Sequence, residues 1–167
     1  MEADPSSTYQ GPTKAVTAAA IDSSGTFFAG SYDGRIMAVT ANGTVEPVSG
    51  SGHSNHVSGI TCTDGKKMSS VAFDDTLREF VSGKFDSASL STAGQPKGIA
   101  GADDGTVFVA TVSAVEAAKA GKKVANLKVA YTPSSIAVSG RVVAVGAEVS
   151  ACALVCPSQH ELTICGG

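Results

Sequence analysis

The sequence predicts an all-β protein built from about four repeated units of short strands. Two segments, Gly30–Arg35 and Val71–Thr76, share a small residue, an aromatic residue and Asp in the same order, and they start 41 positions apart. The chain has 19 Gly and only 16% charged residues, which favours strands joined by turns over charged amphipathic helices. A period of about 40 to 45 residues is the length of one four-stranded blade of a β-propeller.

The first unit follows a polar stretch, residues 1–13, that has little to bury. We therefore expect a flexible lead-in there. After it, runs of alternating apolar and polar residues are separated by Asp22–Gly25, Asp33-Gly34 and Asn42-Gly43. Such Gly-containing turns are hairpin signals, so residues 14–50 are predicted to form one complete blade.

The second unit, residues 51–91, carries the clearest version of this pattern. It opens on Gly52-His53 and turns at Asp74-Asp75 before its third strand. In one class of propeller blade, a His after Gly and an Asp in this turn lie close enough to hydrogen-bond and so fix the outer edge of the blade. We predict that His53 and Asp74 form such a pair, with a structural role, because a buried polar pair that satisfies itself stabilises a turn.

The third and fourth units carry the pattern more weakly, at about residues 95–131 and 134–167. Ser113–Lys123 has high helix propensity and competes with the strand expected there, but the phase of the repeat favours the strand. About four blades make a partial or abbreviated propeller, since closed propellers have roughly four to eight. An open arc would leave sheet faces and edges unpaired, and self-association through those edges would cover them.

Composition argues against nucleic acid and membranes as partners. The net charge is −3, and the largest basic clusters are Lys66-Lys67 and Lys122-Lys123, whereas nucleic-acid-binding surfaces carry extended basic patches. No run approaches the roughly 18 apolar residues of a membrane span. The N-terminus has neither the basic start nor the apolar run of a secretory signal. We therefore expect a cytoplasmic protein.

The C-terminal segment holds four candidate zinc ligands: Cys152, Cys156, His160 and Cys165. Spacings of this order can bind zinc tetrahedrally. However, Cys152, Leu154 and Cys156 alternate along one predicted strand, and buried free Cys behaves as a small hydrophobe. We therefore predict reduced structural cysteines, Cys62 among them, with no metal and no cofactor. The zinc site is the weaker alternative.

The sequence predicts no catalytic residues. A Ser-His-Asp set can be assembled from His53 or His56 with Asp74 or Asp75, but serines are so numerous that this coincidence is expected, and no G-x-S-x-G motif is present. Gly101–Gly105 lacks the Lys and the glycine spacing of a phosphate-binding loop and places two carboxylates where phosphate would lie.

Three motifs together resemble the actin-interacting protein 1 family. They are the opening set Gly50, Gly52, His53, Asn55 and Val57, the turn Asp74–Arg78, and Gln95-Pro96-Lys97 before the next strand. The resemblance spans roughly residues 10–146, in the same order. It implies a cytosolic WD-repeat protein that binds actin and cofilin and promotes the disassembly of cofilin-decorated actin filaments, without enzymatic activity.

The chain also departs from that family. The family is built from two seven-bladed propellers joined side by side, and about four blades would run from the end of the first propeller into the start of the second. Pro12 stands where a Gly-His pair would open the first unit, so that unit would lack its His–Asp bond. Phe80 stands at the position usually held by Trp. The alternative is a generic WD-repeat scaffold for protein interactions, without actin activity.

Overall fold

The computed structural model describes the backbone of residues 14–140, 142–147, 152–158 and 161–165, and the side chains of the first two of these ranges. The expected lead-in, residues 1–13, lies outside the described residues. Within the described ranges every regular element is a β-strand, and the strands form four sheets of four. The predicted fold class, an all-β chain of about four propeller-like blades, is confirmed.

The first sheet contains β1 (Val16–Ile21), β2 (Phe27–Ser31), β3 (Ile36–Val39) and β4 (Val45–Pro47). The second contains β5 (Val57–Thr63), β6 (Lys67–Ala72), β7 (Thr76–Val81) and β8 (Lys84–Ser91). The third contains β9 (Pro96–Gly101), β10 (Thr106–Thr111), β11 (Ala114–Lys119) and β12 (Lys122–Lys128). The fourth contains β13 (Pro133–Ser139), β14 (Val142–Ala147), β15 (Cys152–Ser158) and β16 (Glu161–Cys165).

Each sheet is an antiparallel meander in which neighbouring strands follow one another in sequence. The segment with high helix propensity forms β11, a turn at Ala120-Gly121, and the start of β12, so the strand prediction is confirmed. Both turn residues have positive φ, 49° and 71°, as a two-residue hairpin turn requires. The burial of Ala114–Ala118 inside the third sheet outweighs a helix propensity of a few tenths of a kcal/mol per residue.

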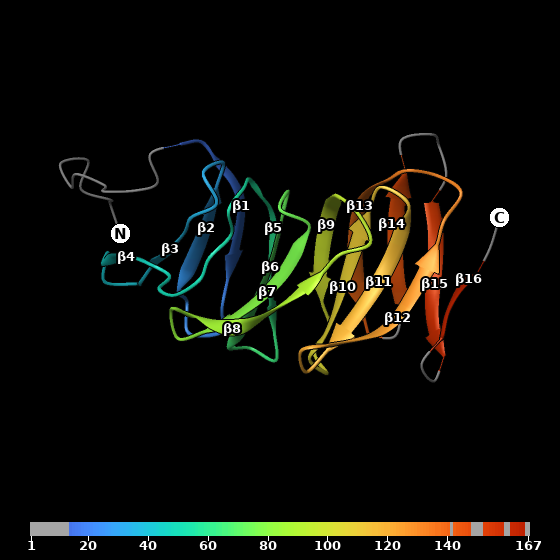
Figure 1. The fold of residues 1–167 in the computed structure, drawn as a ribbon. Helices are drawn as coiled ribbons and strands as arrows, with labels where there is room; N and C mark the ends of the chain where they lie inside the picture. Colours follow the sequence, from blue (N-terminus) through green and yellow to red (C-terminus); the bar gives the residue numbers. More distant parts are fainter. Residues whose placement is uncertain (1–13, 141, 148–151, 159–160, 166–167) are drawn as a thin grey trace.

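The four sheets stack in sequence order, and the first and fourth lie at opposite ends of the row (Figure 1). The inner strands β1, β5, β9 and β13 contact one another in turn. Glycines allow these strands to approach closely: a Cβ added at Gly59 would lie 2.7 Å from Ile99 Cγ2, and one at Gly98 would lie 3.2 Å from Ile136 Cγ2. Each sheet therefore buries one face against the next.

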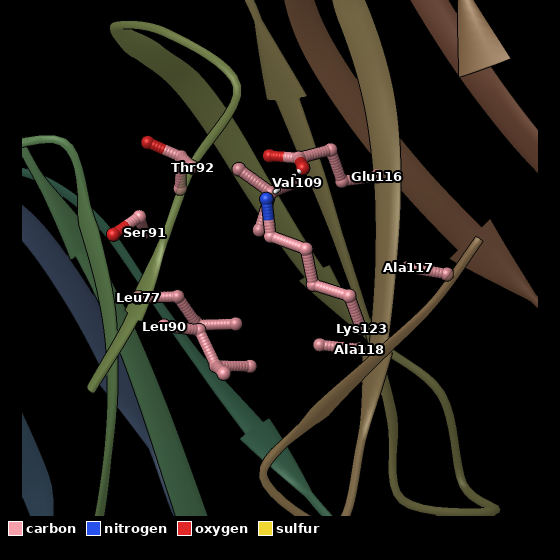
Figure 2. Close-up of a pocket in the computed structure, with 9 residues that line it drawn as sticks. All are labelled: Leu77, Leu90, Ser91, Thr92, Val109, Glu116, Ala117, Ala118 and Lys123. Carbon is pink, nitrogen blue, oxygen red and sulfur yellow. Dashed lines mark hydrogen bonds and ion pairs between the residues drawn. The ribbon is translucent and has the colours of Figure 1, made fainter. Parts of the chain in front are cut away.

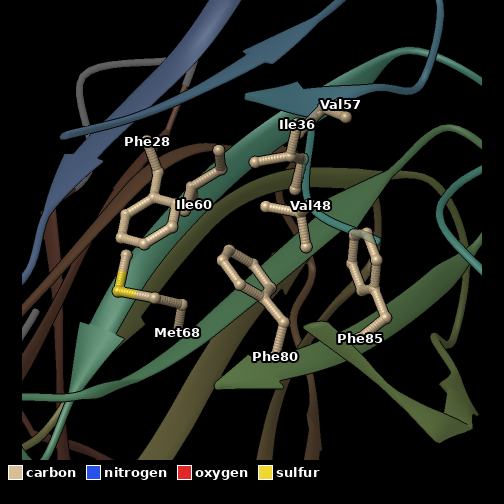
Figure 3. Packing of buried hydrophobic residues seen from close by; sticks show 8 residues of the cluster. All are labelled: Phe28, Ile36, Val48, Val57, Ile60, Met68, Phe80 and Phe85. Atoms are coloured by element: carbon tan, nitrogen blue, oxygen red, sulfur yellow. The ribbon is translucent and has the colours of Figure 1, made fainter. Parts of the chain in front are cut away.

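Three apolar clusters fill the spaces between successive sheets. In the first, Phe28 of β2 meets the edge of Phe80 of β7 at a ring-centroid distance of 5.3 Å, with Met68 beside them (Figure 3). Val71 and Val107 belong to the cluster between the second and third sheets. The cluster between the third and fourth sheets is built around buried valines and one phenylalanine, namely Phe108, Val115, Val143 and Val145.

Replacing Gly59 with Ala should weaken the contact between the second and third sheets. The added methyl group would clash with the Cγ2 methyl of Ile99, and overpacking of this kind costs about 1–3 kcal/mol in the free energy of unfolding. Urea denaturation measures this loss. In the double variant Gly59→Ala/Ile99→Ala the clash is gone. The double variant should therefore lose about 1 kcal/mol less free energy of unfolding than the two single variants lose together. Strict additivity would contradict a direct contact.

Candidate functional site

The structure brings the two predicted residues of the second blade together. His53, on the loop before β5, has a fully buried side chain whose Nδ1 lies 3.2 Å from Oδ1 of Asp74 in the β6–β7 turn. On its other side, His53 Nε2 lies 2.9 Å from the Ser70 hydroxyl on β6. The Thr76 hydroxyl and the Ser54 N–H donate to the two oxygens of Asp74, at 2.7 and 2.9 Å. This network joins the loop, the turn and the central strand.

Burial, acting against the hydrogen-bond network, favours the neutral form of His53. Burial lowers the pKa of His53 and outweighs the neighbouring Asp74 carboxylate, which acts to raise it. Burial also acts to raise the pKa of Asp74, but the hydrogen bonds from Thr76 and Ser54 prevail and lower it. The arrangement fits Nδ1–H donating to the Asp74 carboxylate and Nε2 accepting from Ser70. Phe80 stands at the position usually held by Trp. Its side chain has no N–H to donate, and it packs in the apolar cluster between the first and second sheets.

Three rings, Tyr32, His56 and Phe73, lie together at the same end of the first two blades, and we call them the aromatic trio. Tyr32 stacks on His56 at a centroid distance of 4.8 Å, and His56 contacts Phe73 at 4.6 Å. The His56 backbone is fixed on both sides, because its N–H donates to the Asn55 side chain at 2.8 Å and its carbonyl accepts from Phe73 N–H at 2.9 Å. Tyr32 itself is 60% exposed.

A glycine lets the two blades meet at the aromatic trio. Gly34, in the turn between β2 and β3, has φ of 85°, and a Cβ at this position would lie 2.5 Å from the His53 carbonyl oxygen. Its missing side chain allows the turn that carries Tyr32 to rest on the loop that carries His53. Asp33 in this turn corresponds to Asp74, and it accepts hydrogen bonds from the Ser31 hydroxyl and the Arg35 N–H. Pro12, the residue expected to interrupt the first blade's pattern, lies outside the described residues.

An open groove runs across the starts of the four inner strands. It is lined by one three-residue stretch from each strand: Thr17–Ala19, Ser58–Ile60, Lys97–Ile99 and Ser134–Ile136. Val16 pairs with Ser31 and Val57 pairs with Ala72, so the groove opens at the same end of the sheets as the aromatic trio. Hydroxyl groups and the Lys97 side chain give this groove its polar character.

A buried carboxylate connects the second and third blades. Figure 2 shows Glu116 and Lys123 facing Leu77 and Leu90 across a small cavity between these sheets. The Glu116 side chain is only 4% exposed and forms an ion pair with Lys123. Its Oε2 accepts the Ala93 N–H at 2.7 Å, which ties the segment between β8 and β9 to β11. The contacts of Glu116 therefore fit a structural role.

The weaker alternative, a zinc site, falls on a part of the chain whose side chains lie outside the described part. Cys152 and Cys156 are on β15 and Cys165 is on β16, whereas His160 lies outside the described residues. Among the described residues, no group of three or more His, Cys, Asp or Glu side chains is arranged to hold a metal ion. Cys62 is a free thiol, and burial raises its pKa. Within the described ranges no helix is long and apolar enough to cross a membrane.

Comparison with solved structures assigns the fold. The crystal structure of the RRP9 WD40 repeats is similar with a TM-score of 0.81 and 13% identity, over 93% of this chain and 52% of that chain. The computationally designed Ika4 protein is similar with a TM-score of 0.76 and 17% identity, over 88% of this chain and 94% of that one. This chain therefore has the fold of WD40 repeats and spans about half the length of the RRP9 chain.

These similarities establish the fold alone. No protein-family model matches the sequence, and no curated protein matches it. Matches extend to 944 chains of solved structures, and a fold shared so widely hosts many functions. What this chain does must therefore be argued from its own residues.

Sequence reasoning missed the aromatic trio. The repeat aligns Tyr32 with Phe73, directly before Asp33 and Asp74 in the two turns, and this recurrence was the available signal. Nothing local placed His56 between the two rings. That contact depends on how the first blade packs against the second.

Replacing Asp74 with Asn should destabilise the second blade. The change removes the charge from hydrogen bonds with His53, Thr76 and the Ser54 N–H, and hydrogen bonds to charged groups are worth about 1.5–3 kcal/mol. Asp75 is the matched control, because it lies in the same turn with φ of 54°, a conformation that Asn also adopts. Thermal and urea unfolding should show a clear loss for Asp74→Asn and little change for Asp75→Asn. Equal effects would contradict the role of the network.

Stability should fall as the pH drops below about 6.5, the ordinary pKa of His. Because the pKa of folded His53 is lowered, His53 binds a proton in the unfolded chain just below this pH but does not bind one in the folded chain. Acid therefore favours unfolding. The contribution of Asp74, whose pKa is also lowered, is lost only at pH values near or below 3.8. Urea denaturation between pH 7.5 and 5 should show a weaker pH dependence for His53→Gln than for His56→Gln. A slope unchanged by His53→Gln would contradict the assignment.

Proposed function

We propose that this chain is a non-enzymatic protein-binding module that presents the turn end of its first two blades to a partner protein. The observation that carries the proposal is the aromatic trio: an exposed Tyr32 held in place by His56 and Phe73. Aromatic residues are enriched among the side chains that dominate protein interfaces. A ring that is already stacked loses little conformational entropy on binding.

The motifs that resemble actin-interacting protein 1 suggest the partner. One of them, the segment from Gly50 to Val57, forms the loop that carries His53 and His56, so the resemblance and the aromatic trio fall on one surface. We propose that this surface binds cofilin-decorated actin filaments in the cytoplasm. A surface that prefers subunits in the decorated state shifts the equilibrium toward disassembly, because binding favours whichever state it binds more tightly.

A generic WD40 scaffold without actin activity is the second candidate. It is favoured by the fold, because a fold shared with so many solved structures hosts many binding functions. On this alternative the aromatic trio still binds a protein, but not actin or cofilin.

The chain should increase the amount of unsedimented actin when mixed with cofilin-decorated filaments, and should have no such effect on bare filaments. Tyr32→Ala should weaken this effect about tenfold, as for the loss of a contact worth about 1.4 kcal/mol. Val124→Ala is the matched control, because Val124 is a 41% exposed apolar residue on β12, away from the turn carrying Tyr32. The measurement is actin in the supernatant after centrifugation, as a function of chain concentration.

Two results would contradict the proposal at different levels. If the folded chain leaves all actin in the pellet with cofilin present, the actin function is wrong and the generic scaffold remains. If the chain is active and Tyr32→Ala behaves as Val124→Ala does, the partner is right but the binding surface is not the aromatic trio.

A further inference from the structure

The second sheet ends in a strand, β8, whose outer edge is open along most of its length. β8 is the last strand of this sheet. From Asp86 to Ser91 every residue is exposed except Leu90, which is half-buried. The edge of a sheet presents N–H and C=O groups to which a strand of another chain can hydrogen-bond.

The corresponding edges of the first and third sheets are protected, whereas that of β8 is not. β4 has only three residues and ends at Pro47, and β12 carries three lysines, Lys122, Lys123 and Lys128. Short strands, proline and lysine are the usual means by which proteins prevent an edge from pairing. The segment Ser87–Ser91 contains neither proline nor a charged residue. β8 is therefore the edge that another strand can reach.

Alternate residues of β8 direct their backbone groups toward the open edge. The Phe85 N–H donates to the carbonyl of Ser49, on the segment that follows β4, at 2.9 Å, and so points outward. The Thr92 N–H donates to the carbonyl of Asp75, beside the next strand of its own sheet, at 2.8 Å, and so points inward. Because the direction of these groups alternates along a strand, the residues that present free N–H and C=O groups are Ser87, Ser89 and Ser91.

Contacts within the chain close this free edge at both ends. At one end the Phe85 N–H is already bonded to Ser49. At the other end the Ala93 N–H donates to the Glu116 carboxylate at 2.7 Å. The free edge is therefore limited to the three serines, which are spaced symmetrically about Ser89.

We propose that β8 pairs with β8 of a second copy of this chain, antiparallel and about a two-fold axis at Ser89, so that the two second sheets join into one continuous sheet. Ser89 faces Ser89 of the other copy, and Ser87 of each copy faces Ser91 of the other. Residues opposite each other with outward-pointing backbone groups exchange both N–H and C=O. Every free backbone group of the three serines then has a partner.

The contacts at the two ends of the free edge select this register. Moving the axis by one residue in one direction would pair Ser91 with Phe85, and moving it in the other direction would pair Ser87 with Ala93. The N–H groups of Phe85 and Ala93 are already bonded within their own chain. Only an axis at Ser89 pairs the three serines with one another.

The side chains are compatible with this register. Ala88 of one copy faces Leu90 of the other, an apolar pair, and Leu90 lies beside Leu77 at the boundary with the third sheet (Figure 2). Asp86 faces Thr92 of the other copy, so that no two like charges meet. A two-fold contact uses the same surface of both chains, and association therefore stops at two.

This inference is independent of the proposed binding function. β8 is the outermost strand of its sheet, whereas the aromatic trio lies at the turn end of the first two blades. Either proposal can therefore fail while the other holds.

Sedimentation equilibrium of the purified chain tests the association. The mass should rise from 16.6 kDa toward twice that value and no further, over concentrations from about 10 µM to about 1 mM, which bracket the dissociation constant of a weak contact. A mass of 16.6 kDa throughout would overturn the proposal and leave the edge to an extended segment of another protein. A mass that rises beyond twice the chain mass would also overturn it, because a two-fold contact is closed.

Charged residues at the axis test whether β8 forms the contact. Ser89→Lys and Ser89→Glu should each weaken association about fivefold, because two like charges then lie directly opposite each other. An equimolar mixture of the two variants should associate at least as tightly as the unchanged chain. Ser87→Lys is the matched control on the same strand, because its lysine faces Ser91 and should change association little.

Association of Ser89→Lys and Ser89→Glu equal to that of the unchanged chain would overturn the proposal, since the contact would then lie elsewhere. Circular dichroism and thermal unfolding check that each variant is folded. The Ser89 side chain is exposed and its N–H points away from β7, so we expect both variants to fold.

Cross-linking tests the register. Cα atoms of such a hydrogen-bonded pair lie about 5.5 Å apart, within the roughly 4.4–6.8 Å that a disulfide spans. On mild oxidation Ser89→Cys should form a disulfide-linked pair of chains. Ser87→Cys should form none by itself but should link to Ser91→Cys when the two are mixed. The unchanged chain, oxidised in the same way, controls for its own cysteines. A Ser87→Cys variant that links to itself as fast as Ser89→Cys would overturn the axis at Ser89.

Discussion

The close packing of each sheet on the next is the constraint on which the rest of this structure depends. A single four-stranded meander cannot bury an apolar face by itself, so each sheet must cover its neighbour. Gly59 and Gly98 bring the inner strands close enough for isoleucine side chains to fill the space between them. The three apolar clusters follow from this spacing, and so does the order of the sheets along the molecule.

Polar contacts then fix the parts that the apolar clusters leave free. His53 joins a loop, a turn and a central strand through Asp74 and Ser70. Glu116 holds the segment between the second and third blades through Lys123 and the Ala93 N–H. Both are buried groups whose partners are already in place, and such networks favour one arrangement over near alternatives. The aromatic trio depends on the first of them, since His56 follows His53 on the same loop.

Much of the candidate site was within reach of the sequence. The pattern of one class of propeller blade placed His53 before the first strand of the second unit and Asp74 in the turn before its third strand, and the structure has them in contact. Ser70 and Thr76 carry no comparable signal, because Ser and Thr are frequent throughout the chain. No signal in the sequence pointed to the ion pair of Glu116, because this residue lies in a segment with high helix propensity. Only the phase of the repeat favoured a strand there.

The sequence by itself determined the strands, the turns and the number of blades. These features are local: alternation specifies a strand, and Asp-Gly or Asn-Gly pairs supply the positive φ that hairpins need. Only the tertiary structure decided which face of each strand meets the next sheet, and it alone placed Tyr32, His56 and Phe73 side by side. It also left Phe27 exposed at one end of the row and Val142 at the other. The physical reason is that these contacts depend on the distance and curvature between sheets. The volumes of side chains that lie far apart in the sequence set that distance and curvature jointly.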